Sequence, residues 1–187
     1  MDSRTDQALM LSFRDGDAAA FESLYGRHRA SLYRFFGRQA AKACVDDLFQ
    51  ETWLRVIRGK STYRPDGVFR AYLFRIAHNV LVDHYRREAN PAQPSRSADI
   101  EAVDPASGPD SEYGIDALRT AIAGALTRMP AAQREVFLLH QDGGLTLEQI
   151  GEIVGAGRET VKSRLRYAVE RLREALTEHP EVREKRA

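Results

Sequence analysis

The sequence predicts an all-α protein in which two small helical domains are joined by a flexible acidic linker. Three observations lead to this fold class. Apolar residues recur at spacings of three and four over most of the chain, and no segment alternates with the period of two that a strand requires. A stretch rich in Pro, Ser and Gly interrupts this pattern at residues 91–114. Residues 145–166 have the pattern of two helices around a tight turn.

The first predicted domain, residues 10–90, is built from three amphipathic helices separated by turn signals. The helices are one capped by Asp17 that continues through Phe36, one from about Val45 to near Gly59, and one from Phe69 to about Glu88. The residues from Tyr63 to Gly67 are typical of a turn between the second and third helices. A helical bundle is therefore expected.

The predicted linker, residues 91–114, contains four prolines and almost no periodic apolar residues. Such a segment buries too little surface to offset its conformational entropy, and it is long for a connection within one domain. It is also acidic, because residues 91–116 hold six acidic side chains and one arginine. Residues 52–90 hold eight basic side chains against three acidic ones, and residues 156–176 hold six against three. Two basic modules thus flank an acidic segment, and a polyanion could contact both.

Several kinds of function are excluded or disfavoured by composition. No apolar run approaches the roughly 20 residues of a membrane span, and the polar N-terminus lacks a secretory signal, so a cytoplasmic protein without membrane insertion is expected. Cys44 is the only cysteine, which excludes an internal disulfide and a cluster of thiolate ligands. His78 and His84 are six residues apart, on different helix faces, and match no zinc pattern. No metal, no cofactor, no catalytic residue and no enzymatic activity are predicted.

The second predicted domain, residues 115–177, contains a helix-turn-helix. Thr146 caps the first helix of the motif and Gln149 completes a capping box, while Gly155 supplies the left-handed residue at its end. The residues expected to face inward are Leu147, Ile150, Val154, Val161, Leu165, Ala168 and Leu172. The polar residues left exposed on the second helix are Arg158, Glu159, Thr160, Lys162, Ser163 and Arg166.

These exposed residues are candidates for DNA contact, because the N-terminal part of such a helix enters the major groove. Arg can pair with guanine in a bidentate manner, which is worth about 1–3 kcal/mol of discrimination. Lys162 is suited to a phosphate, which confers affinity but no sequence information. The alternative is a helical hairpin whose basic face is merely solvated.

The two modules together resemble the extracytoplasmic-function (ECF) sigma factors of the sigma-70 family, which keep sigma region 2 and sigma region 4 joined by a linker. The resemblance extends from about Asp17 to Leu176. The stretches that carry it are Ala20-Phe-Glu-Ser-Leu-Tyr, Asp47-Leu-Phe-Gln-Glu-Thr-Trp-Leu-Arg, Phe69-Arg-Ala-Tyr-Leu-Phe-Arg-Ile-Ala-His-Asn and Glu159-Thr-Val-Lys-Ser-Arg-Leu. It implies a subunit that binds core RNA polymerase and directs promoter-specific initiation, commonly under an anti-sigma factor or another regulator.

The resemblance also implies roles for particular residues. Those at the polymerase-docking helix are Asp47, Gln50, Glu51 and Arg55. The residues at the loop and helix that would capture and melt the minus-ten element are Tyr63, Arg64, Phe69, Arg70, Tyr72, Arg75, His78 and Asn79. Aromatic rings interleaved with arginines suit single-stranded DNA, which exposes bases and phosphates together. Both sets have alternatives: the docking residues could form an ordinary solvated face, and Phe69 and Tyr72 could belong to the core.

The chain departs from the family pattern at three places. The polymerase-docking helix commonly starts Asp-Ala-Glu-Asp but here reads Cys44-Val45-Asp46-Asp47, so polymerase affinity could be weaker or could depend on an added negative charge, for example on Thr52. The usual Trp of the melting helix is Tyr72, and Gly157-Arg158-Glu159 opens the recognition helix.

Two other functions stay open, a DNA-binding regulator that acts without polymerase and a helical adaptor that binds only protein.

Overall fold

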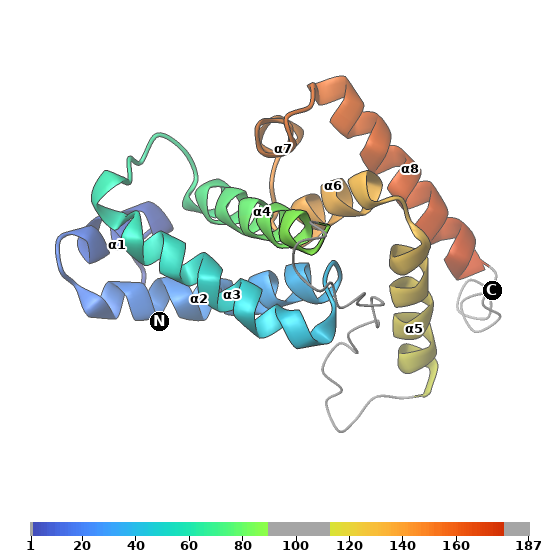
Figure 1. The fold of residues 1–187 in the computed structure, drawn as a ribbon, viewed down its shortest axis with the longest axis horizontal. Helices are drawn as coiled ribbons and strands as arrows, with labels where there is room; N and C mark the ends of the chain where they lie inside the picture. The colour runs from blue at the N-terminus through green and yellow to red at the C-terminus, as the bar shows by residue number, and fades with distance from the viewer. Residues whose placement is uncertain (1, 90–112, 178–187) are drawn as a thin grey trace.

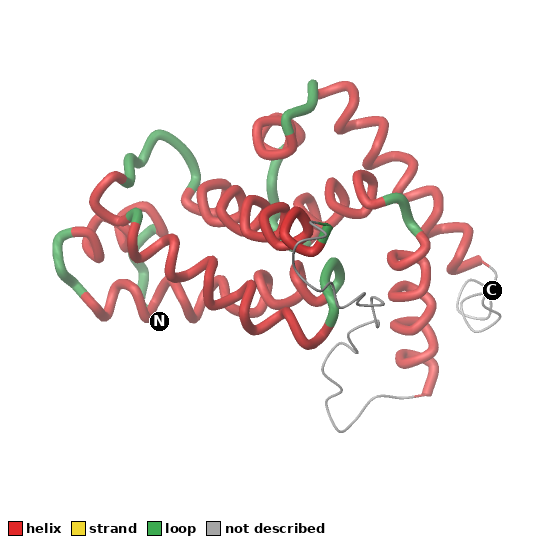
Figure 2. Tube along the Cα trace, viewed as in Figure 1, coloured by secondary structure: helices red, strands yellow, loops and turns green. Residues whose placement is uncertain are grey.

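The computed structural model describes residues 2–89 and 113–177, and within them the chain forms eight α-helices, one short 3-10 turn and no strand. The elements of the first part are α1 (Asp6–Arg14), α2 (Ala18–Gly37), α3 (Lys42–Arg58), η1 (Lys60–Thr62) and α4 (Phe69–Glu88). Those of the second part are α5 (Tyr113–Arg128), α6 (Ala131–Gln141), α7 (Leu147–Val154) and α8 (Arg158–Thr177). The all-α prediction is confirmed (Figure 2).

The helices of the first part follow the predicted ones closely. The side chain of Asp17 accepts a hydrogen bond from the amide of Ala20 at 3.2 Å, which caps α2 as expected. Helix α4 begins at Phe69 and ends at Glu88, and α3 begins at Lys42, three residues before the predicted start. Aromatic rings from three helices form the core, with Phe35 and Phe74 packed edge to face at 5.3 Å between ring centroids.

Helix α1 was not predicted from the sequence. The Thr5 side chain accepts a hydrogen bond from the amide of Ala8 and so caps the helix, and Leu9, Met10 and Phe13 bury one face against α2. Both signals are visible in the sequence, a Thr-Asp start and apolar residues at spacings of one and three.

The helix-turn-helix has the predicted local geometry. Thr146 and Gln149 form the complete capping box of α7, and Gly155 adopts a left-handed conformation with φ of 66°. Gly151 admits the close approach of the turn, since a Cβ there would lie 2.6 Å from the carbonyl oxygen of Ala156. Leu147, Val154 and Leu165 are half-buried and pack against the core as predicted, and the structure adds Ile153, which is buried, to the inward residues.

The two parts of the molecule pack against each other, and their buried apolar residues form one continuous cluster (Figure 1). Helix α4 packs against α3 and also contacts α7. Asp142, which follows α6 and is buried, accepts hydrogen bonds from Arg34 Nε at 3.1 Å and Arg38 Nη1 at 3.2 Å. These two arginines lie on or just after α2, so the carboxylate joins the two parts.

The predicted linker, residues 91–114, lies outside the described residues except for its last two positions, which begin α5. Among the helices that are described, none combines the length and the apolar character needed to cross a membrane.

Candidate nucleic-acid and polymerase interfaces

The first turns of α8 present the polar residues that were predicted to contact DNA. Arg158, Glu159, Thr160, Lys162 and Arg166 are exposed, and Ser163 is half-buried. Val161 is fully buried, and together with Ala168 and Leu172 it seats the opposite face of α8 on the domain core. The helix is therefore held by its apolar side while its polar side faces solvent.

Acidic neighbours accompany the basic groups of α8. Arg158 Nε lies 2.5 Å from Glu148 on α7, and this hydrogen bond and charge raise the pKa of Arg158 while Glu148 has a lowered pKa. Lys162 Nζ lies 3.7 Å from Glu159, and Arg166 Nε lies 3.9 Å from Glu170. All these pairs are exposed, so each contributes little to stability and a phosphate could displace the carboxylate.

The loop before α4 has exposed and buried positions. Arg64 is exposed, but Tyr63 is 4% exposed and its ring packs against Phe69 and Tyr72. Phe69 is fully buried, which is the alternative that the sequence left open, so its ring offers no exposed face to a base. Tyr72 is half-buried. Direct stacking of a base on Tyr63 or Phe69, as expected from the sequence, is not available in this structure because both rings are used by the core.

The polar residues of α4 turn toward the second part of the molecule. Arg75 Nη2 lies 3.2 Å from Glu152 of α7, and His78 Nδ1 lies 2.6 Å from Glu135 of α6. The Arg70 guanidinium lies against Gly144, where a Cβ would approach Arg70 Nη1 to 2.7 Å. Asn79 is exposed. The structure thus brings three residues predicted to contact DNA into the interface between the two parts.

Helix α3 presents a stripe along its solvent side that includes the predicted docking residues. Asp47 and Gln50 are exposed, and Glu51 and Arg55 form an ion pair at 2.8 Å. Leu54 is 42% exposed on the same stripe, although it is not among the docking residues predicted from the sequence. Its position, four residues after Gln50 and three after Glu51, was the available signal, since residues at that spacing share one helix face.

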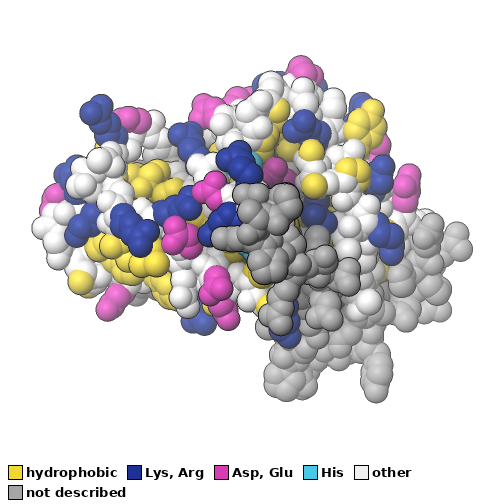
Figure 3. Space-filling view, in the orientation of Figure 1, with side chains coloured by type: hydrophobic (Ala, Val, Ile, Leu, Met, Phe, Trp, Pro, Cys, Tyr) yellow, Lys and Arg dark blue, Asp and Glu magenta, His cyan; other side chains and the backbone are white. Residues whose placement is uncertain are grey.

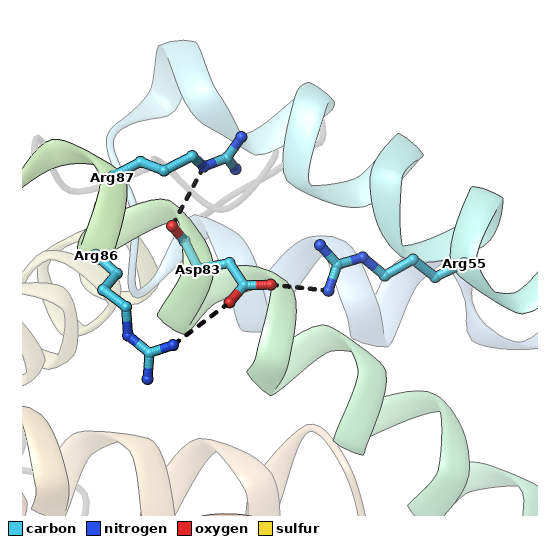
Figure 4. Close-up of a pocket in the computed structure, with 4 residues that line it drawn as sticks. All are labelled: Arg55, Asp83, Arg86 and Arg87. Atoms are coloured by element: carbon cyan, nitrogen blue, oxygen red, sulfur yellow. Dashed lines mark hydrogen bonds and ion pairs between the residues drawn. The ribbon is translucent and has the colours of Figure 1, made fainter. Parts of the chain in front are cut away.

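Arg55 also belongs to a basic pocket between α3 and α4 (Figure 4). Asp83 lies at its centre: its carboxylate is 3.0 Å from Arg55 Nη1 and 3.9 Å from Arg86 Nη1, and its backbone carbonyl accepts a hydrogen bond from Arg87. The hydrogen bond that Arg55 donates to the Glu51 carboxylate raises the pKa of Arg55, although partial burial opposes this shift. Three arginines line the pocket and Asp83 is the one acidic residue among its lining residues, so the pocket is positively charged.

Thr52 does not lie on the exposed stripe. Its side chain is fully buried, and its hydroxyl donates a hydrogen bond to the carbonyl oxygen of Leu48 at 2.8 Å. Phosphorylation of Thr52, considered from the sequence as a replacement for the missing acid, is therefore sterically blocked in the folded domain.

On the face seen in Figure 3, basic and acidic side chains interleave, and apolar side chains gather on the first part of the molecule.

Two family models match this chain. Residues 20–90 match the family model for sigma-70 region 2, and residues 125–174 match the model for sigma-70 region 4. The RNA polymerase sigma factor CarQ of Myxococcus xanthus is 32% identical over 170 residues, which cover 90% of this chain and 96% of CarQ. The ECF RNA polymerase sigma factor SigL of Mycobacterium tuberculosis is 36% identical over 167 residues, covering 87% and 92% of the two chains. The chain belongs to the ECF sigma factors of the sigma-70 family.

Solved structures support the same fold. CnrH in complex with the cytosolic domain of CnrY matches with a TM-score of 0.66 and 24% identity, over 92% of this chain and 97% of that one. The sigma factor RpoE of Bartonella quintana, solved with the anti-sigma factor NepR, matches with a TM-score of 0.68 and 23% identity, over 84% and 96%.

Proposed function

We propose that this sigma factor binds core RNA polymerase through the exposed stripe of α3, opens the minus-ten element with the loop before α4 and with α4 itself, and reads the minus-thirty-five element with α8. Residues 10–90, 91–114 and 115–177 would then be the melting domain, the linker and the recognition domain. The observation that carries the proposal is the match of residues 20–90 to region 2 and of residues 125–174 to region 4 in one chain.

For the minus-thirty-five element, we assign base contact to the first turns of α8. Arg158, Glu159 and Thr160 precede the buried Val161, so the turn that would enter a major groove first carries donors and acceptors. Lys162, Ser163 and Arg166 continue the exposed side and would contact phosphates or base edges. Each carboxylate now paired with these cations can turn to solvent when a phosphate arrives, because all the pairs are exposed.

For the minus-ten element, the burial pattern divides the predicted residues into two groups. Arg64 and Asn79 are exposed and would contact melted DNA directly. Tyr63 and Phe69 would instead hold the shape of the loop, because their rings pack together beneath it. Melting would use the binding energy of captured bases and phosphates, so the protein needs no nucleotide hydrolysis and no catalytic residue.

Arg70, Arg75 and His78 would join Arg64 and Asn79 on the DNA once α4 separates from the second part of the molecule. Arg75 and His78 are now paired with Glu152 and Glu135, which belong to the recognition domain. Tyr72 is half-buried in the first turn of α4. It would take the place that Trp holds in the family pattern.

For polymerase docking, we assign the stripe of α3 formed by Asp47, Gln50, Glu51, Leu54 and Arg55. An exposed leucine flanked by charged residues is typical of a protein interface, where an apolar centre is surrounded by polar contacts. The absence of the family's first acid, at Cys44, leaves Asp46 and Asp47 as the acids of this helix start, and Asp46 accepts a hydrogen bond from Tyr33 at 2.7 Å.

A regulator that covers both domains, such as an anti-sigma factor, is also proposed. Two structural relatives, CnrH and RpoE, were each solved with a bound protein partner. Such a partner would compete with polymerase for the α3 stripe.

The test is reconstituted transcription with bacterial core RNA polymerase and genomic templates. The proposal expects specific start sites with the wild-type chain, loss of minus-thirty-five-dependent initiation in the Lys162→Ala and Arg166→Ala variants, and little duplex binding without polymerase. A tight sequence-specific gel shift by the chain alone would favour a self-sufficient regulator, and unchanged activity of both variants would favour an adaptor that binds only protein. The absence of start sites on every template would overturn the proposal.

A further inference from the structure

Three side chains with metal-binding atoms meet where the first turns of α3 lie beside the last turns of α4. The Cys44 sulfur, a ring nitrogen of His84 and a carboxylate oxygen of Glu88 all lie within 4.8 Å of one another. His84 and Glu88 are one helical turn apart on α4, with Nε2 and Oε1 separated by 3.5 Å. Cys44 comes from the other helix, at the position where the family's first acid is missing.

We propose that Cys44, His84 and Glu88 form a binding site for zinc or a similar divalent transition metal ion. Thiolate, imidazole and carboxylate are the side-chain ligands that zinc takes in proteins, and three of them leave a fourth position of the tetrahedron for water or another ligand. The metal would connect the start of the polymerase-docking helix to the end of the melting helix.

The geometry needs only a small adjustment to hold the ion. With metal–ligand bonds of about 2.0–2.3 Å, neighbouring ligand atoms of a tetrahedral site lie roughly 3.5 Å apart. The pair on α4 is already at that separation, and the Cys44 sulfur lies within 4.8 Å of both atoms, so a rotation of its side chain can bring it to the bonding distance. All three side chains are partly buried, so they are more restrained than surface groups but are still accessible to an ion.

The electrostatics around the thiol also suit a cation. Burial raises the pKa of Cys44, and the charges of Glu88 and Asp47 raise it further. These carboxylates oppose an isolated thiolate, but they attract a divalent ion that would bind the sulfur and bring its own positive charge. Local sequence patterns do not indicate this site because Cys44 is 40 residues before His84 along the chain.

The simpler reading is that His84 and Glu88 form an ordinary ion pair on one helix and that Cys44 only packs beside them. Cobalt titration of the full chain, freed of metal, separates the two readings. Cys44 is the only cysteine, so a sulfur-to-cobalt charge-transfer band can arise from no other residue. The proposal expects one equivalent of cobalt to bind with this band, accompanied by the visible bands of a tetrahedral site, and to be displaced by zinc.

Variants then assign the ligands. Cys44→Ser should abolish the charge-transfer band, and His84→Gln and Glu88→Gln should each weaken binding by at least about tenfold, since even outer partners of a metal are worth about 10–100-fold in affinity. His140→Gln, at an exposed histidine outside the cluster, is the matched control and should bind like the wild type. Absence of the band in the wild type, or unchanged affinity in both α4 variants, overturns the proposal.

A second measurement keeps the test independent of the folding of the variants. In the wild-type chain, zinc should slow the alkylation of Cys44 by iodoacetamide severalfold, and a chelator should restore the original rate. Equal alkylation rates with and without zinc would contradict the metal site.

Discussion

The carboxylate of Asp142 joins the two domains, and its removal provides a quantitative test of their packing. Its side chain is 4% exposed, while the side chains of Arg34 and Arg38 that bind it are 50% and 30% exposed. Breaking a fully buried ion pair costs about 3–5 kcal/mol, and breaking an exposed one costs about 0–1 kcal/mol. Because the carboxylate is buried but the two guanidiniums can turn to water, we expect Asp142→Asn to lower the free energy of unfolding by about 1–2 kcal/mol.

The position of Asp142 separates the ion pairs from a local effect on its own helix. It follows the C-terminal end of α6, where the helix dipole disfavours a negative charge, so the neutral amide should slightly stabilise α6 itself. A loss of stability in Asp142→Asn would therefore come from the missing partners of Arg34 and Arg38. The sign of the change distinguishes the two effects.

A double-mutant cycle measured by urea unfolding isolates the contact between the domains. Asp142→Asn combined with Arg38→Gln should lower stability by about 1 kcal/mol less than the sum of the two single variants, because the second substitution removes a group that the first has already left without its partner. Arg29→Gln is the control, since Arg29 is exposed on α2 and lies over the Tyr33 ring, and its effect should add to that of Asp142→Asn. Simple additivity in the Arg38 cycle, to within about 0.3 kcal/mol, would refute the packing of the two domains in solution.

Four further outcomes are expected. Lys162→Ala should lower by about 1 the slope of log affinity against log salt concentration for promoter binding by the holoenzyme, with little change in sequence preference. Arg166→Ala should leave the midpoint of thermal unfolding unchanged and reduce minus-thirty-five-dependent transcription. Leu54→Asp should abolish capture of core polymerase in a pull-down while changing the free energy of unfolding by no more than about 0.5 kcal/mol, because the side chain is exposed. Phe69→Ala should lower that free energy by about 3–5 kcal/mol in urea, as expected for a fully buried ring, and a loss below 1 kcal/mol would contradict its place in the core. Burial lowers the pKa of His28, so its neutral form is favoured in the folded state. The contribution of His28 to the free energy of unfolding should be fully present above the ordinary histidine pKa of about 6.5 and should be lost as the pH drops below that value. His28→Gln should remove this part of the pH dependence of the thermal midpoint.

Local signals in the sequence were enough to predict most helices. The cap at Asp17, the capping box at Thr146 and the left-handed Gly155 each depend on residues within four positions, so the sequence contains the whole interaction. Helix α1 carries equally local signals, so it could have been predicted as well. The burial of Phe69 could not be predicted from the local sequence pattern, because an aromatic ring at the start of an amphipathic helix suits a DNA-binding surface and a core equally well.

Contacts between distant segments could not be predicted in the same way. Asp142 and Arg38 are 104 residues apart, and no periodicity links them. The same holds for Cys44 and His84, and for Arg75 and Glu152. Each of these pairs depends on how whole helices pack, which the order of residues along one helix does not determine.

The energies of the contacts between the domains indicate the order in which these contacts would break when the protein binds a promoter. The pair of Arg75 with Glu152 is more than half exposed on both sides, so it is worth at most about 1 kcal/mol and is screened by salt. A DNA phosphate offers Arg75 a comparable partner and releases counterions as well, so this pair would exchange its carboxylate for DNA at little cost. The pair of His78 with Glu135 is more buried, and Asp142 is the most buried of the three acids. Opening should therefore begin at the α7 end of α4, and the release of Asp142 should be the step that limits exposure of the α4 face that we propose to bind DNA.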